Sequence, residues 1–301
     1  MKLVTAAGAG IVALMLLLAP APARAATREY WVAAVPSTWN VVPNGRNAIE
    51  GERYTSDKTT MRTVVYVQYT RDWKRRLPNQ TRIPGPLLRG RVGDDIFVHF
   101  ANRDTVLERP HSMHFHGVRY PFGSDGSFIP GFSGRGGDVM PGQTFTYQLR
   151  AGTDSAGVWP YHDHSPSMMD SIAGGMYGAL SILPPGQPRA DREFVTFFQS
   201  HLGFETINGR AFVGNTPVLH SRVGDTVQWD VLALGDEHHT FHVHGHRWRD
   251  PDGTSIDTRT VGPAESFSFR IKEDTPGTWL YHCHVEQHMM RGMIGLYRVR
   301  R

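Results

Sequence analysis

The stretch that decides the fold is Gly157-Val-Trp-Pro-Tyr-His-Asp-His164, because Gly277-Thr-Trp-Leu-Tyr-His-Cys-His284 repeats it further along the chain. Three other blocks recur in the same order. Arg91-Val-Gly-Asp94 returns at 222–225, His111-Ser-Met-His-Phe-His-Gly117 at 239–245, and Pro141-Gly-Gln143 at 263–265. Four matched blocks in register indicate two copies of one structural unit.

Each copy consists of short runs in which apolar and polar residues alternate, such as Asp95–Phe100 in the first and Thr226–Leu232 in the second. Gly, Pro, Asn and Asp separate these runs, and no long amphipathic helix is expected. The pattern predicts an all-β protein whose units are sandwiches or barrels. Pro and Gly interrupt the strands between Leu183 and Asp191. This seam predicts a first domain over residues 27–185 and a second over 186–301.

The first 25 residues are predicted to be a signal peptide. Lys2 precedes an apolar run over Ile11–Ala19, and Ala23-Arg-Ala25 fits a cleavage site. We therefore expect a secreted protein, located outside the cell or on the exterior of its envelope, with no membrane association after cleavage. Subtracting the charges of Lys2 and Arg24 from the net charge of +4 leaves +2. This balance gives no indication of nucleic-acid binding.

Histidines are the most informative side chains, because eight of the 16 form four His-x-His pairs. Side chains two positions apart on a strand point to the same face, so each pair offers two imidazoles in one direction. Imidazole is a ligand for copper, zinc, iron and nickel. Eight imidazoles from two repeats exceed the need of one ion, so we expect a cluster of two or three metals between the domains. The pairs are His114 and His116, His162 and His164, His242 and His244, and His282 and His284.

The single cysteine, Cys283, lies between two of these histidines and therefore points to the opposite face of its strand. His239 lies three residues before His242, so its side chain points to the opposite face, as that of Cys283 does. His288 and Met293 follow the cysteine within ten residues. Two imidazoles, one thiolate and a distant thioether are the ligand set of a blue-copper electron-transfer site. Cys283 would then join this site to the cluster through a short covalent path.

The first repeat lacks the elements of that second site. His111 matches His239, but Asp163 stands in place of Cys283 and Met168 in place of a histidine. A carboxylate does not replace a soft thiolate ligand. We expect the first domain to hold half of the cluster and no blue copper, with His111 as a structural remnant.

These blocks resemble the multicopper oxidases, and most closely the two-domain bacterial enzymes called small laccases. The segment Tyr281–Met293 is similar to their most specific motif, while Tyr30–Val35 and Gly85–Asp94 resemble the A domains of ceruloplasmin-type oxidases. The resemblance implies two cupredoxin-type Greek-key domains in tandem and four coppers per protomer. It also implies a homotrimer that shares each cluster between the first domain of one chain and the second domain of the next.

The resemblance further assigns ligands to the matching positions. The type 1 copper would be held by His239, Cys283, His288 and axial Met293. The type 2 copper would be held by His114 and His242, and the two type 3 coppers by His116, His162, His164, His244, His282 and His284.

Three further residues match catalytic positions of the family. Asp125 and Asp257 match acids that deliver protons to reduced oxygen, and Tyr120 matches a tyrosine that lends an electron to the cluster. Each also has a simpler explanation. The aspartates are equally well explained as turn residues, and Tyr120 as a packed aromatic side chain.

The sequence thus predicts an oxidase that takes single electrons from a phenolic or similar small reductant and reduces O₂ to water. Three alternatives stay open. A metallo-oxidase acting on Cu(I) or Fe(II) would use the same coppers, and Met289 and Met290 suit Cu(I). A copper nitrite reductase usually carries a blue site in its first domain, which Asp163 argues against. A non-enzymatic copper carrier would leave the His-x-His pairs without a role.

Overall fold

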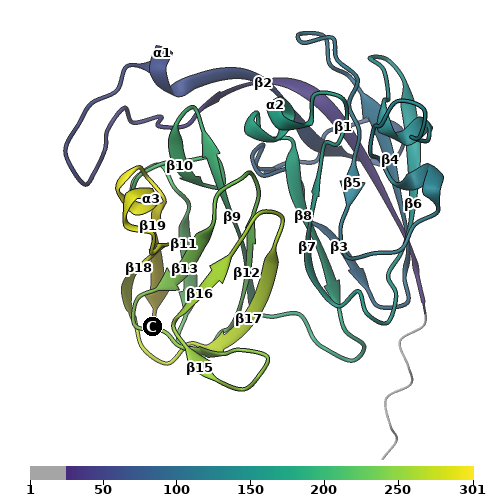
Figure 1. Ribbon diagram of the computed structural model, residues 1–301. Coiled ribbons are helices and arrows are strands. Elements are labelled where there is room, and N and C mark those ends of the chain that lie inside the picture. Colours follow the sequence, from purple (N-terminus) through teal and green to yellow (C-terminus); the bar gives the residue numbers. More distant parts are fainter. Residues whose placement is uncertain (1–24) are drawn as a thin grey trace, which may run out of the picture.

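The chain forms two β-sandwiches that lie side by side (Figure 1). The computed structural model describes residues 25–301, so the predicted signal peptide lies outside the described residues except for Ala25. Strands make up most of the regular structure, which confirms the predicted all-β fold. None of the helices in this range is long and apolar enough to cross a membrane.

The first sandwich consists of two four-stranded sheets with the strand orders β2-β1-β4-β6 and β3-β8-β7-β5. Its strands are β1 (Thr27–Asn40), β2 (Thr60–Tyr69), β3 (Leu88–Arg91), β4 (Asp95–Asn102), β5 (His114–Phe115), β6 (Thr144–Arg150), β7 (Gly157–His162) and β8 (Tyr177–Leu183).

The second sandwich repeats this plan with the orders β10-β9-β12-β17 and β11-β19-β18-β13-β16, and it adds a small hairpin, β14-β15. Its strands are β9 (Arg192–His201), β10 (Phe204–Ile207), β11 (Val218–Arg222), β12 (Thr226–Ala233), β13 (His239–Val243), β14 (Trp248–Arg249), β15 (Ser255–Ile256), β16 (Thr258–Val261), β17 (Ser266–Lys272), β18 (Gly277–Cys283) and β19 (Ile294–Arg300).

Strand pairing explains how the repeated histidines come together. β5 pairs antiparallel with β7, and β13 pairs antiparallel with β18. In this register His114 lies opposite His162, and His242 lies opposite His282. Residues that are about 40 to 50 positions apart in the sequence therefore become direct neighbours on one sheet face.

The helices are short and connect strands. They are α1 (Ser56–Thr59), α2 (Met168–Ala173), α3 (Glu286–Met290) and the 3₁₀ turns η1 (Arg71–Trp73), η2 (Phe122–Ser124) and η3 (Arg135–Gly137). α2 follows β7 and α3 follows β18, so the two helices occupy the same place in the two repeats.

The two sandwiches are joined by polar contacts as well as by apolar packing. Arg89 of β3 donates to the Glu193 carboxylate of β9 at 2.6 Å. His201 of β9 accepts a hydrogen bond from the Tyr177 hydroxyl of β8 at 2.9 Å and donates through Nδ1 to the Ala173 carbonyl at 2.6 Å. Directional contacts of this kind fix the relative orientation of the sandwiches, and those of His201 are buried.

Candidate metal centres

The first candidate centre is a set of four imidazoles at one end of the first sandwich. Neighbouring ring centroids are 5.0 to 5.7 Å apart. Nε2 of His116 lies 3.2 Å from Nε2 of His162. The members of this set, called the first imidazole set below, are His114, His116, His162 and His164.

The second sandwich carries an equivalent group. Its neighbouring ring centroids are 5.1 to 5.5 Å apart, and Nε2 of His244 lies 3.1 Å from Nε2 of His282. The members of this second imidazole set are His242, His244, His282 and His284. The spacing predicted the His-x-His pairs, and strand register brings two pairs together in each sandwich.

Main-chain carbonyl groups orient one ring of each set. Nδ1 of His114 donates to the carbonyl oxygen of Asp125, and Nδ1 of His242 donates to that of Asp257, both at 2.7 Å. A neutral ring that donates from Nδ1 presents a lone pair at Nε2. This second hydrogen bond is typical of imidazoles that ligate metals.

The rings of His162 and His282 are oriented in the same way. Each Nδ1 lies 2.9 Å from the carbonyl oxygen of the next residue, so each Nε2 is an acceptor. Burial lowers the pKa of both rings, and that of His116, to about 4, which makes them neutral at pH 7. In each set, two Nε2 atoms of facing rings lie 3.1 to 3.2 Å apart. This spacing suits a cation that both nitrogens bind.

The structure places Asp125 and Tyr120 beside the first imidazole set. Oδ1 of Asp125 lies 3.7 Å from Nδ1 of His114, and the Tyr120 ring centroid lies 6.1 Å from that of His114. Burial and the Asp125 carboxylate raise the pKa of Tyr120 to about 12. Burial also disfavours the charged form of Asp125, but hydrogen bonds from Ser127 outweigh it and leave the Asp125 pKa below its usual value.

Asp257 lies beside the second imidazole set. Its carbonyl oxygen accepts from His242, and its carboxylate accepts from the Thr258 hydroxyl at 3.2 Å. The same hydroxyl lies 3.0 Å from Nδ1 of His242. The catalytic roles of Asp257, Asp125 and Tyr120 stay predictions.

The third candidate centre lies inside the second sandwich, on the opposite face of the strands that carry the second imidazole set. Nδ1 of His239 and Nδ1 of His288 are 3.1 Å apart. The sulfur of Cys283 lies 3.9 Å from the first and 3.7 Å from the second. The backbone N–H of Thr240 donates to this sulfur at 3.4 Å. Buried and half-buried side chains alternate along β13, so His239 and His242 point to opposite faces, as predicted.

The predicted axial ligand, Met293, lies between α3 and β19. Met293 is fully buried, its N–H donates to the His288 carbonyl at 3.0 Å, and its own carbonyl accepts from the Cys283 N–H at 3.1 Å. α3 is the element that turns His288 back toward the sulfur, and the sequence did not predict it. Burial lowers the pKa of His239 to about 4 and raises that of Cys283. Two imidazoles and one sulfur fit copper.

Comparison with known proteins agrees with this geometry. Two family models match the chain, and both are described as multicopper oxidase; one covers residues 65–187 and the other 187–301. The chain belongs to the multicopper oxidase family. Membership implies copper as the metal, and it confirms the family predicted from the repeated blocks.

The relatives of this chain include proteins that are much longer than it is. Ferroxidase HEPHL1 of Homo sapiens is 28% identical over 91% of this chain and 29% of its own length. Ceruloplasmin of Homo sapiens is 30% identical over 90% of this chain and 30% of its own length. The chain thus spans about three tenths of the length of these curated relatives. A solved multicopper oxidase structure is 25% identical, with a TM-score of 0.70 over 91% of this chain and 89% of that one.

In the first sandwich, a histidine between two carboxylates occupies the place of the third centre. Nδ1 of His111 lies 3.3 Å from the Asp163 carboxylate, and Nε2 lies 3.2 Å from the Asp104 carboxylate. All three side chains are buried. Both ring nitrogens are therefore engaged by carboxylates. The arrangement supports the expectation that the first sandwich holds no blue copper, although no sequence motif pointed to Asp104.

The sequence also did not predict a second network, around the half-buried His246. His246 lies directly beyond the second imidazole set, where Nδ1 donates to the His244 carbonyl at 2.7 Å and Nε2 contacts Glu273 at 3.0 Å. Burial disfavours the charged ring, but the Glu273 carboxylate outweighs it and raises the pKa of His246. The only sequence signal was a third histidine at a spacing of two.

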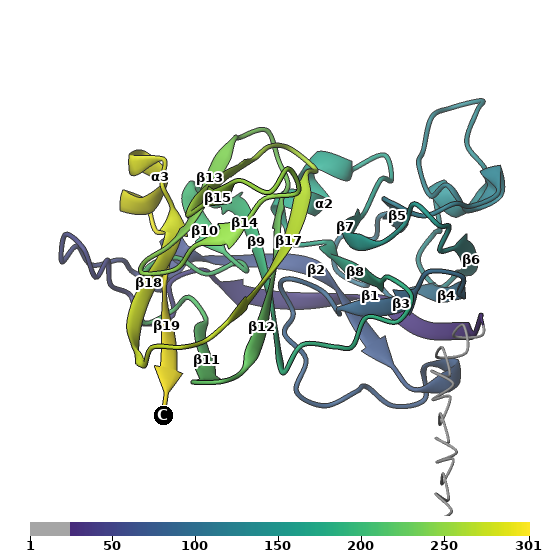
Figure 2. The same ribbon diagram turned by 90° about the horizontal axis from the view of Figure 1, so that it is seen from below.

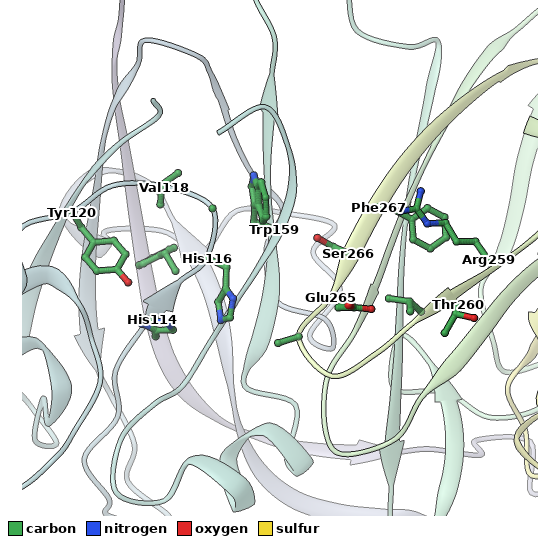
Figure 3. Close-up of a pocket in the computed structure, with 14 residues that line it drawn as sticks. His114, His116, Val118, Tyr120, Trp159, Arg259, Thr260, Glu265, Ser266 and Phe267 are labelled. Atoms are coloured by element: carbon green, nitrogen blue, oxygen red, sulfur yellow. The ribbon is translucent and has the colours of Figure 1, made fainter. Parts of the chain in front are cut away.

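The two imidazole sets lie in different sandwiches. β5 and β7 belong to one, while β13 and β18 lie on the far side of the other (Figure 1). Within residues 25–301, no ring of one set is in contact with a ring of the other. A cavity of about 530 Å³ lies beside the first set, between His116 and Tyr120 on one side and Glu265 and Phe267 on the other (Figure 3).

Proposed function

We propose that this chain is a copper-dependent oxidase that couples one-electron oxidation of a small reductant to the four-electron reduction of O₂ to water. The observation that carries this proposal is the placement of Cys283. Its sulfur faces His239 and His288, while its chain neighbours His282 and His284 belong to the second imidazole set. One run of three residues thus joins an electron-accepting site to a site with room for several metals.

The residues present suit four coppers in three environments. Bound copper would supply the one-electron chemistry that these side chains lack. The type 1 copper would be held by His239, Cys283, His288 and Met293, the type 2 copper by His114 and His242, and the type 3 pair by His116, His162, His164, His244, His282 and His284.

The remaining side chains have separate tasks in this proposal. The peptide bonds on either side of Cys283 form the covalent connection between the two sites. The ionised Asp125 carboxylate, with one oxygen 3.7 Å from Nδ1 of His114, would relay protons toward the first set, and the Asp257 carboxylate would do the same beside the second set. Tyr120 is an electron donor at the edge of the first set. Proton delivery from carboxylates close to the reacting centre is a common form of acid–base catalysis.

We further propose that each cluster forms between two chains of a homotrimer. The supporting observation is that the two imidazole sets lie in separate sandwiches of one chain. The first domain, residues 27–185, would supply one set, and the second domain of the next chain, residues 186–301, would supply the other. The amino-terminal pattern over residues 1–25 supports a secreted location.

The proposed reductant is an electron-rich phenol or a similar small donor. It would approach the half-buried His288, whose neighbours Met289 and Met290 are also partly exposed. A second candidate reductant is a metal ion, Fe(II) or Cu(I). The name of the relative Ferroxidase HEPHL1 favours it, as do the exposed Asp236 and Glu237 just before His239. Negative charge beside an electron-entry site attracts cations.

The test is to load the purified chain with copper and to record its absorption and electron paramagnetic resonance spectra. Oxygen uptake is then compared with a phenol, Fe(II) and Cu(I) as reductants. We expect a blue band, a type 2 signal and uptake with the phenol. Uptake with the metal ions alone would establish the metallo-oxidase instead. A blue band with no type 2 signal and no uptake would refute the oxidase.

A further inference from the structure

A cavity of about 430 Å³ lies at the joint between the two sandwiches, and no histidine of the three candidate metal centres lines it. At this joint β12 and β17 of the second sandwich pack against β7 of the first (Figure 2). The lining contains three arginine side chains and no carboxylate. The arginines all come from the second sandwich and are Arg249 of β14, Arg259 of β16 and Arg270 of β17. We call this space the arginine cavity.

Two of the three guanidinium groups lack a counter-charge within residues 25–301. Arg259 pairs with the Asp250 carboxylate. Arg270 is half-buried and donates to neutral acceptors, the Gln228 side-chain oxygen at 2.7 Å and a main-chain carbonyl at 2.9 Å. Arg249 donates to a main-chain carbonyl at 2.8 Å. A partly buried charge without a counter-charge is costly, and the planar guanidinium fork matches a carboxylate. The arginine cavity therefore suits an anion.

One buried carboxyl group lies behind the lining of the cavity. Gln228 and Ser268, which both line the cavity, donate to one oxygen of Asp230 at 2.9 and 2.6 Å. The Asp230 side chain itself does not line the cavity. Burial, reinforced by the Glu193 carboxylate, raises the pKa of Asp230. In slightly acidic solution Asp230 is therefore largely uncharged, and the guanidinium groups dominate the charge of the cavity.

Apolar side chains form much of the remaining lining. Trp248 and Phe269 of the second sandwich stack with their ring centroids 4.1 Å apart, and Leu183 and Pro184 line the cavity from the end of the first domain. Cavities of roughly 300 to 1,000 Å³ that combine apolar walls with a few polar groups are typical of sites for small organic molecules. An inorganic anion would leave these apolar walls unused. The lining thus suits an organic anion that carries an apolar ring.

We propose that the arginine cavity binds an aromatic carboxylate, whose charged group pairs with the guanidinium groups and whose ring packs between the two sandwiches. This inference is independent of the redox chemistry proposed above, because no metal ligand lines the cavity. A ligand that contacts both sandwiches binds the folded chain and not the unfolded one. It therefore also raises the temperature at which the chain unfolds.

The test titrates the copper-loaded full chain with benzoate by calorimetry in slightly acidic buffer, and with benzamide as the neutral analogue of similar shape. We expect benzoate to bind and to raise the thermal midpoint, and benzamide to do neither. Arg249→Gln and Arg270→Gln should each weaken benzoate binding roughly tenfold or more, because each removes a charge-assisted hydrogen bond. The matched control is Arg298→Gln, at an exposed arginine of β19 outside the cavity, which should bind benzoate like the wild type.

Arg249→Gln decides the outcome if Arg270→Gln fails to fold, because Arg249 is exposed and contacts a loop carbonyl. Absence of benzoate binding, equal affinity for benzamide, or unchanged affinity in Arg249→Gln would overturn the site. Phosphate that binds as tightly as benzoate would overturn the aromatic ligand. Benzoate that shifts the blue band and binds both arginine variants like the wild type would place the anion at copper and also overturn the inference. Oxygen uptake tests the oxidase separately, and the arginine variants should leave it unchanged.

Discussion

Protonation of His201 is expected to weaken the contact between the two sandwiches as the pH falls. The side chain is 1% exposed and bridges β9 to the first sandwich through Tyr177 and Ala173. Its Nδ1 donates and its Nε2 accepts, an arrangement that requires the neutral ring. Burial lowers its pKa from 6.5 to about 4.

The sign and size of the effect follow from this shift. The unfolded chain binds the proton near pH 6.5, whereas the folded chain binds it only near pH 4. Stability from the neutral ring is therefore fully present above pH 6.5 and is lost as the pH falls from 6.5 to 4. One pKa unit corresponds to about 1.4 kcal/mol, so the loss is about 2 kcal/mol at pH 5 and about 3 kcal/mol at pH 4.

The assay is urea unfolding of the copper-free protein, followed by tryptophan fluorescence between pH 7.5 and 4.5. In His201→Asn the amide can still donate to the Ala173 carbonyl, but the titrating ring is gone. The wild type should be more stable at pH 7.5, and its advantage should shrink by about 2 kcal/mol at pH 5. Tyr177→Phe is the control, because it loses the hydrogen bond and keeps the ring. A difference between wild type and His201→Asn that stays constant with pH would refute the reasoning.

Three further predictions concern single side chains. Cys283→Ser should abolish the blue band of the copper-loaded protein and keep the type 2 signal; a retained blue band would exclude the sulfur as its ligand. Asp163→Asn should lower the free energy of unfolding by about 3 kcal/mol, because it breaks a buried pair with His111. Asp154→Asn is the control: it removes an exposed pair with Arg119 and should leave the thermal midpoint unchanged. Trp229→Ala, in the core of the second sandwich, should cost about 3–5 kcal/mol in urea unfolding, and a loss below about 1 kcal/mol would contradict the packing.

The metal-binding groups could be predicted to different degrees. The pairing of His242 with His244 follows from a spacing of two on a strand, which is a local property. The same rule predicted that Cys283 faces away from its neighbours. The contact between His111 and Asp104 could not be predicted, because it depends on how the loop that carries Asp104, seven residues before His111, folds back. α3 was not predicted either, because five residues carry too little periodicity to indicate a helix.

By itself, the sequence determined the repeat, the all-β class and the faces on which the histidines lie, because alternation along a strand is set within a few residues. Only the tertiary structure decided which imidazoles meet. Strand register brings His114 opposite His162 and His242 opposite His282, while the packing of the sandwiches keeps these two pairs apart. The exposure of each side chain was also decided only there, since exposure depends on which neighbours cover a side chain and the local sequence does not specify them.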